Sequence, residues 1–247
     1  MKRASQGIGL IELMVAMVLG LVVVLGVTQV FISAKNTYQS QNAAAVMQED
    51  ARYLLSRMTQ DLRMVGMFGC IDPGNASFID STPALAFTAA AAQPIRYVAN
   101  ASTGNVLTLM TGDVGTSGTS PSYVIVTNCK TVATVYTGAL APAFAVSANV
   151  GLMSLPIRQV IYTFKDNQIL TGSGTNQQVL VNNVSSFTLT FGMAATATDA
   201  GIASYTSAPS SAALIRSVRI SLVLTDPSNR VRNQTYNVVA TLRNRIH

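Results

Sequence analysis

The residue with the clearest chemical meaning is Glu12, the only charged side chain in an otherwise apolar run from Ile8 to Ala34. A carboxylate in a membrane-length apolar helix costs about 2.5 to 3.5 kcal/mol at the bilayer centre and less near an interface, so an acid retained there indicates a function. Such a carboxylate can pair with a cationic group, and the attraction is strongest where water is excluded. We therefore expect Glu12 to bind a partner.

A short basic leader precedes the apolar run. Residues 1 to 7 include Lys2 and Arg3, and the apolar segment begins directly after Gly7. The leader is too short to hold the regions of a cleaved secretory signal, so the apolar segment is expected to stay in the mature chain. An ordinary signal anchor is the alternative, because ~20 apolar residues cross a bilayer and the basic residues would hold the amino terminus in the cytoplasm. That alternative leaves Gly7 and Glu12 unexplained.

The segment from Gly7 to Val15 resembles the class III signal of type IV pilins and pseudopilins. The resemblance implies that a prepilin peptidase cuts between Gly7 and Ile8 and methylates the new amino terminus at Ile8. Glu12 then takes the fifth mature position, where the family carries its glutamate, and can pair with the amino terminus of a neighbouring subunit. The chain departs from the commonest pattern by having Ile8 where Phe is usual and Gly9 where a small hydroxyl residue is common.

After the apolar segment the helical pattern becomes amphipathic. Apolar residues recur every three or four positions at Met47, Ala51, Leu54, Met58, Leu62 and Val65, with polar residues between them. This spacing predicts one helix from about Ile8 to about Met67, ended by Gly66, Gly69 and the turn at 72–74. The predicted segments are a leader at 1–7, a membrane and assembly half of the helix at 8–34, an amphipathic half at 35–68 and a β-rich domain at 69–247.

Short strands separated by turns follow Cys70. The candidates are Val106–Met110, Tyr123–Thr127, Thr131–Thr137, Val160–Phe164, Gln178–Val181, Phe187–Phe191, Val218–Thr225 and Tyr236–Leu242. The last two alternate apolar and polar residues around a turn at 226–229. This alternation predicts an antiparallel sheet that the amphipathic helix covers on one face, an α+β fold. The polar stretches 112–122, 171–176 and 194–211 are predicted to be surface loops.

Cys70 and Cys129 are the two cysteines of the chain, and both follow the anchor. In an oxidising compartment outside the inner membrane, two thiols on one domain are expected to form a disulfide with each other. The alternative is a pair of buried free thiols.

Residues 52–70 resemble the end of the helix in the PilW family of type IV pilus minor pilins, which carries a similar Asp-Leu-Arg, Gly and Phe-Gly-Cys pattern. Residues 241–245 resemble that family's carboxy-terminal ending. The resemblance implies an inner-membrane protein that joins other minor pilins and the major pilin, starts pilus assembly and can remain at the tip with an adhesin. A type II secretion pseudopilin, which would share Gly7, Glu12 and the helix, is the nearest alternative.

The residues give little support to an enzyme, although a signal-anchored periplasmic enzyme is the alternative from another class. His247 is the single histidine and the last residue, so a catalytic Ser-His or Cys-His pair would depend on the terminus. Asp72 and Asp80 are the candidates for paired carboxylates, and loop residues in solvent explain them better. Metal-ligand spacing and a nucleotide-binding loop are lacking, so we expect no cofactor and no metal.

The sequence near the carboxy terminus is basic, with Arg216, Arg219, Arg230, Arg232, Arg243 and Arg245. Such a stripe could contact nucleic-acid phosphates without reading sequence. Aromatic residues are not interleaved with these arginines as in single-strand binding proteins. We therefore expect a solvated face or a contact with another subunit, and not direct DNA binding.

Overall fold

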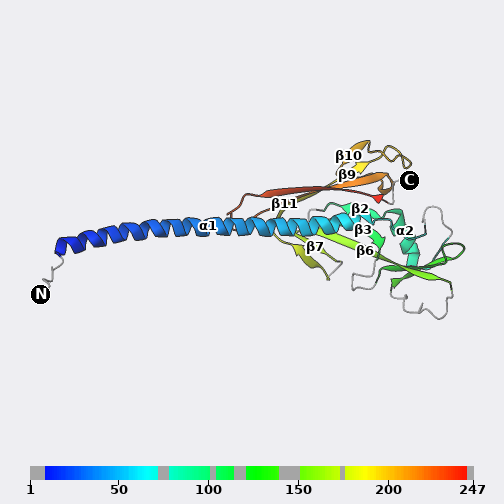
Figure 1. Cartoon of the computed structure of the whole chain (residues 1–247). Helices are drawn as coiled ribbons and strands as arrows, with labels where there is room; N and C mark the ends of the chain where they lie inside the picture. The colour runs from blue at the N-terminus through cyan, green and yellow to red at the C-terminus, as the bar shows by residue number, and fades with distance from the viewer. Residues whose placement is uncertain are drawn as a thin grey trace.

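The computed structural model describes residues 9–71, 78–100, 104–113, 121–138, 151–172 and 176–243 of the 247-residue chain. One helix, α1 (Leu10–Arg63), contains 54 residues and at 1.5 Å per residue is about 80 Å long. Its amino-terminal part projects away from the β-rich domain, and its carboxy-terminal part lies against that domain (Figure 1). The predicted long helix joined to a β domain is confirmed.

The helix ends four residues earlier than predicted, at Arg63 and not near Met67. Gly66 has a φ of +74°, which most residues avoid, and its N–H donates to the Met110 carbonyl over 3.0 Å. Val65 forms an antiparallel bridge with Thr111. Pairing with the strand that contains these partners therefore replaces the last predicted helical turn.

Most of the described strands lie in a first sheet of eight. These strands are β1 (Ile79–Asp80), β2 (Ile95–Val98), β3 (Asn105–Gly112), β4 (Tyr123–Thr127), β5 (Ala133–Thr137), β6 (Met153–Lys165), β7 (Gln168–Thr171) and β8 (Gln178–Val181). The order is β1-β5-β4-β6-β3-β2, and β7 joins β6 to β8 beside this path. The pairs are antiparallel except β1 with β5.

A second sheet has the order β10-β9-β11-β12 and is antiparallel throughout. Its strands are β9 (Val184–Met193), β10 (Ser204–Thr206), β11 (Ile215–Leu224) and β12 (Gln234–Thr241). Asp226 closes the predicted turn between β11 and β12, since its carboxylate accepts hydrogen bonds from the N–H groups of Ser228, Arg230 and Val231. The described strands therefore form two sheets where one was predicted, and β10 lies inside the stretch predicted as the loop 194–211.

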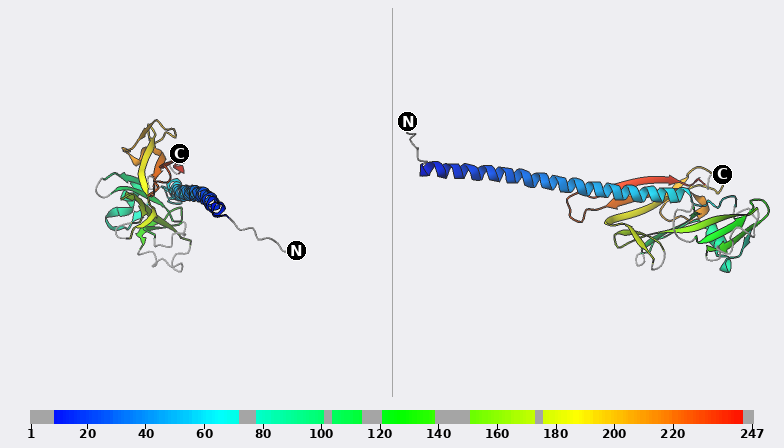
Figure 2. Two further views of the ribbon diagram at one scale, coloured as in Figure 1. Left: turned by 90° about the vertical axis from the view of Figure 1, so that its left-hand side faces the viewer. Right: turned by 60° about the horizontal axis from the view of Figure 1, so that its bottom comes forward.

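The main core joins the helix to both sheets. The predicted apolar stripe is confirmed: Met47, Ala51, Leu54, Met58, Leu62 and Val65 are all buried. The two sheets meet beneath the helix, where the rings of Tyr97 and Phe191 are 5.7 Å apart. Seen along the helix axis, both sheets lie to one side of α1 (Figure 2).

A smaller core lies at the end of the domain far from the projecting helix. It centres on Phe87 of the short helix α2 (Ala86–Ala92), whose ring makes edge-to-face contacts with Phe68, Phe78 and Tyr123. Two single-turn 3₁₀ helices, Pro83–Leu85 and Ala212–Leu214, precede α2 and β11. This second core places the segment after α1 against the first sheet.

Candidate assembly interface

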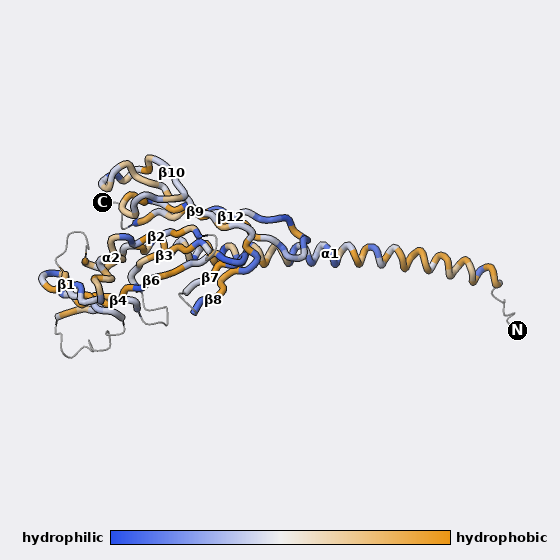
Figure 3. Tube along the Cα trace, turned by 180° about the vertical axis from the view of Figure 1, so that it is seen from behind, coloured by the Kyte–Doolittle hydropathy of each residue, from blue (hydrophilic) through white to orange (hydrophobic). Residues whose placement is uncertain are grey.

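The first part of α1 is a bare apolar surface. Large apolar side chains from Leu10 to Ile32 are each at least 49% exposed, and no part of an 18-residue window with a mean hydropathy of 2.8 is buried. Figure 3 shows this hydrophobic segment extending beyond the domain. The 25 residues from Leu10 to Ala34 are about 37 Å long, enough to cross the hydrocarbon layer of a bilayer. Lipid or other helices must therefore cover this segment.

Glu12 lies in the first turn of α1, and its side chain is exposed. Its backbone N–H donates to the Gly9 carbonyl over 3.0 Å, so the residue is already helical. An acid in the first turn is favoured by the helix dipole. Within the described residues Glu12 has no hydrogen-bonding or ionic partner for its carboxylate, which leaves it available to another chain. Gly7 and Ile8 lie outside the described residues.

A buried ion pair fixes the other end of the helix to the domain. Asp61 is 4% exposed and accepts a hydrogen bond of 3.1 Å from Nη2 of Arg158 on β6. The hydroxyl of Tyr162, also on β6, donates to the second carboxylate oxygen of Asp61. Burial, and then the adjacent charge of Asp61, raise the pKa of Tyr162 well above its usual range, so its hydroxyl stays a donor. These contacts fix the rotation of α1 about its own axis and its position along the first sheet.

This ion pair was not predicted from the sequence, although the sequence contains a signal for it. Asp61 follows Leu54 by seven positions and Met58 by three, so it lies on the buried stripe where only apolar residues were noted. A charged residue at a buried helical position requires a partner. Arg158 and Tyr162 were not singled out, because nothing local in the sequence connects them with a residue about a hundred positions earlier.

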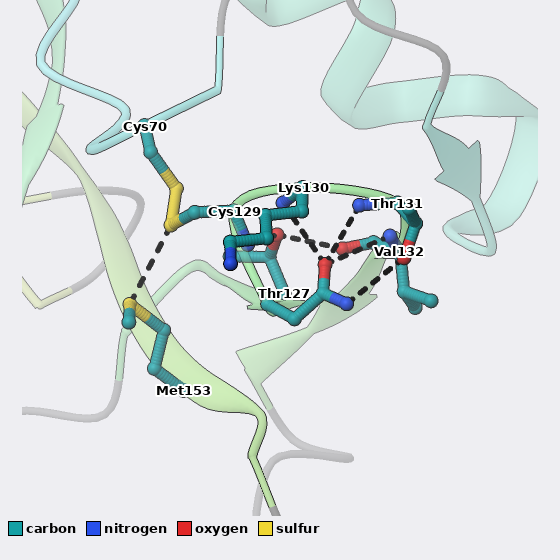
Figure 4. Close-up of a disulfide and its surroundings, with 8 residues drawn as sticks. Cys70, Thr127, Cys129, Lys130, Thr131, Val132 and Met153 are labelled. Atoms are coloured by element: carbon teal, nitrogen blue, oxygen red, sulfur yellow. Dashed lines mark hydrogen bonds between the residues drawn. A yellow bond between two sulfur atoms is a disulfide. The ribbon is translucent and has the colours of Figure 1, made fainter.

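The predicted disulfide between Cys70 and Cys129 is confirmed, with Cα atoms 5.6 Å apart (Figure 4). Cys129 occupies a tight turn after β4 with a φ of +59°. Asn128 holds this turn by accepting hydrogen bonds of 2.9 to 3.0 Å from three backbone N–H groups, at residues 130 to 132. The Sγ of Cys129 lies 3.7 Å from the Sδ of Met153, a packing contact because neither sulfur carries a hydrogen. The disulfide thus connects the segment after α1 to the first sheet.

The structure gives Asp80 a structural role. Its carboxylate accepts hydrogen bonds from the N–H and hydroxyl groups of Thr82 and Thr88 around the start of α2. Burial opposes ionisation, but these hydrogen bonds outweigh it and lower the pKa of Asp80. Asp72, the other candidate carboxylate, and His247 lie outside the described residues. The described residues also hold no group of three or more acidic, cysteine or histidine side chains suited to a metal ion.

The basic stripe near the carboxy terminus does not form one solvated face. Arg216 is 3% exposed and donates to the carbonyls of Ala197, Asp199 and Ala213 at 2.6 to 2.8 Å. It therefore organises the preceding loop and is not available to phosphates. Arg219 is exposed and lies 5.7 Å from the ring centre of Tyr205. The other members of the stripe that the structure describes, Arg230, Arg232 and Arg243, are exposed, while Arg245 lies outside the described residues.

Comparison with known proteins adds one family match. Residues 2–28 match the model of the prokaryotic N-terminal methylation motif, which covers the leader, Glu12 and most of the exposed apolar segment. No curated protein matches the chain. The motif implies processing by prepilin peptidase and assembly with other pilins, and the apolar part of α1 fits anchoring in the inner membrane. This amino-terminal motif indicates a pilin-type protein that prepilin peptidase processes, either a type IV pilin or a pseudopilin.

Proposed function

We propose that the protein is a minor pilin of the type IV pilus that starts pilus assembly and stays at the tip. Residues 1–7 are the leader, 8–34 the membrane and assembly half of the helix, 35–68 the amphipathic half, and 69–247 the periplasmic domain. Prepilin peptidase cuts between Gly7 and Ile8 and methylates Ile8. Before assembly the protein crosses the inner membrane once, with its amino terminus in the cytoplasm.

The uncovered apolar surface of α1 is the observation that carries this proposal. In the membrane, lipid covers the segment. When the subunit leaves the bilayer, the same surface must pack against the helices of other subunits, because exposure to water is unfavourable. Glu12 then pairs with the positive amino terminus of a neighbouring subunit in a region of low dielectric, where the attraction is strong and selects one register.

The segment that resembles the PilW family favours a pilus over a secretion machine. Within residues 52–70, Asp61 forms the buried ion pair and Cys70 the disulfide, so both contribute to attaching the helix to the domain. The domain is large for a repeating shaft subunit and suits a cap. Its proposed partners are the other minor pilins, the major pilin and a tip adhesin.

A type II secretion pseudopilin is the second candidate, because it would use the same leader, helix and acid. Deleting the gene separates the two. A minor pilin predicts that surface pili disappear while secretion of folded enzymes continues. Normal pili with blocked secretion would instead identify a pseudopilin.

The amino terminus tests the processing step independently. Mass spectrometry of the membrane-extracted protein is expected to find a chain that begins at methylated Ile8. An intact leader in cells with an active peptidase, or an amino terminus elsewhere, would contradict the assignment to prepilin-type proteins.

A further inference from the structure

Strand β12 forms an edge of the second sheet. Among the described strands it pairs with β11 alone. The N–H of Leu242 donates to the carbonyl of Arg216, opposite it across the ladder, so alternate residues from Leu242 backwards direct their backbone groups at β11. The intervening residues direct their N–H and C=O groups away from β11. These residues are Thr235, Asn237, Val239 and Thr241.

This edge lacks the features that normally prevent a strand from pairing with another chain. Edge strands are commonly kept short, bulged, or marked with lysine or proline. The pairing of β12 with β11 continues over eight residues without a register shift, and β12 contains neither a charged residue nor a proline. The side chains of Thr235, Asn237, Val239 and Thr241 are all exposed. The strand is therefore regular, accessible and able to accept a neighbour.

A groove runs between this edge and the helix. β12 lies alongside the domain end of α1 in two views of the molecule (Figures 1 and 2). Asn237 and Val238 both line the groove, and since consecutive strand residues point to opposite faces, the groove reaches the backbone edge between them. Ser56 and Gln60 of α1 lie on the opposite wall, and the groove has a volume of about 630 Å³.

The groove is positively charged. Arg52 and Arg63 of α1 and Arg243 after β12 line it, and none of the described residues that line it is acidic. The ion pairs within the described part of the chain involve Arg158 and Lys165, so all three groove arginines lack an acidic partner there. An occupant with negative side chains would complement these charges.

We propose that this groove binds an extended acidic segment of a companion subunit, which adds to β12 as a further strand. The outward backbone groups supply hydrogen bonds and the three arginines select acidic side chains. A second copy of this chain fits less well, because the chain carries a net charge of +6, and its side chains still sum to +4 once the leader with Lys2 and Arg3 is removed. Nucleic acid could pair with the arginines but would leave the backbone edge unmatched. The identification of the companion as another pilin rests on the proposed function. The free strand edge and the positive charge of the groove are independent of it.

A defined peptide tests the proposal. The probe is an eight-residue fluorescent peptide of alternating glutamate and valine, matched to the length of β12, with a lysine-valine peptide as control. Fluorescence anisotropy with the full chain in non-ionic detergent is expected to show salt-sensitive binding of the acidic peptide alone. Arg243→Glu is expected to weaken binding about threefold or more, since an exposed ion pair is replaced by repulsion.

A proline substitution tests the backbone contribution. Asn237→Pro removes an N–H that points away from β11 and leaves the β11 ladder intact. It is expected to weaken peptide binding about tenfold, because one backbone hydrogen bond is lost and the proline ring obstructs the added strand. Asn237→Thr keeps the N–H and is the matched control, expected to bind like the native chain. Val239→Pro provides a second test at the same edge.

Three results would overturn the proposal. They are equal binding of the acidic and lysine peptides, unchanged binding by both proline variants, and a labelled DNA duplex that binds better than the acidic peptide. The peptide assay does not depend on pili, so peptide binding by a protein whose deletion leaves pili intact would reject the proposed function and keep the groove. Loss of pili on deletion, together with no peptide binding by the protein, would instead support the proposed function and reject the binding groove.

Discussion

Replacing Asp61 by alanine is expected to destabilise the domain by about 3 kcal/mol. The change leaves the Arg158 guanidinium without its counter-ion and the Tyr162 hydroxyl without its acceptor. Breaking a buried ion pair by removing one partner typically costs about 3 to 5 kcal/mol. Because the Arg158 side chain remains 19% exposed, water can reach part of the unpaired charge, and we expect the lower end of that range. Against a total stability of about 5 to 15 kcal/mol, this loss is large.

Urea unfolding of the full chain in non-ionic detergent measures this effect, followed by tyrosine fluorescence because the chain has eight tyrosines and no tryptophan. Tyr162→Phe removes only the hydroxyl and is expected to cost about 1 kcal/mol. Replacing the pair by apolar residues, with Asp61→Leu and Arg158→Met together, is expected to recover stability relative to Asp61→Ala. A cost below about 1 kcal/mol for Asp61→Ala, or a double variant no more stable than Asp61→Ala, would refute the reasoning.

Three further predictions concern the domain. Reducing the Cys70–Cys129 disulfide, which spans 59 positions, is expected to lower the unfolding free energy by about 4 kcal/mol, and an unchanged thermal midpoint with dithiothreitol would count against this. Because the pKa of Asp80 is lowered in the folded protein, its carboxylate stabilises the fold above about pH 4, and this stabilisation is lost as the pH falls through that pKa. Asp80→Asn should therefore reduce the acid-induced loss of stability measured by urea unfolding. An identical acid dependence in the variant would oppose this. Leu62→Asp buries an unpaired charge and should abolish piliation through misfolding, whereas Leu62→Met should cost less than about 1.5 kcal/mol and keep pili.

The helix and the last hairpin could be predicted because local patterns determine them. The stripe from Met47 to Val65 has helical spacing, and the alternation from Val218 to Leu224 marks one buried strand face, as the structure shows. The helix end was placed too late because Gly66 acts through a bond to Met110, a contact that sequence spacing does not reveal.

Features that depend on distant partners could not be predicted. β2 and β7 are four-residue strands whose place is set by β3 and β6, and their own sequences lack a clear alternation. The division into two sheets follows from the order of pairing, which has no local signature. Arg216 looked like one member of a solvated basic stripe, yet carbonyl groups from the preceding loop surround it.

Two parts of the candidate site were predicted from the sequence, the disulfide and the apolar segment around Glu12. The cysteines could be paired because the chain has only two, and the apolar run around Glu12 was visible directly. The assignments of Gly7 and Ile8 to cleavage, of Ile8 to methylation and of Glu12 to assembly stay predictions. The basic groove beside β12 was not predicted, because Arg52, Arg63 and Arg243 come together only through the packing of α1 on the sheet.

Glu12→Ala tests the central claim most directly. The substitution makes α1 more apolar, so membrane insertion is expected to be normal or improved. Pairing with the amino terminus of a neighbour would be lost, and the assembly account predicts that the variant accumulates in the inner membrane but is missing from sheared pili and does not co-purify with other pilins. The measurement is the ratio of pilus-incorporated to membrane-resident protein by quantitative immunoblot. A ratio equal to that of the native chain would contradict the account.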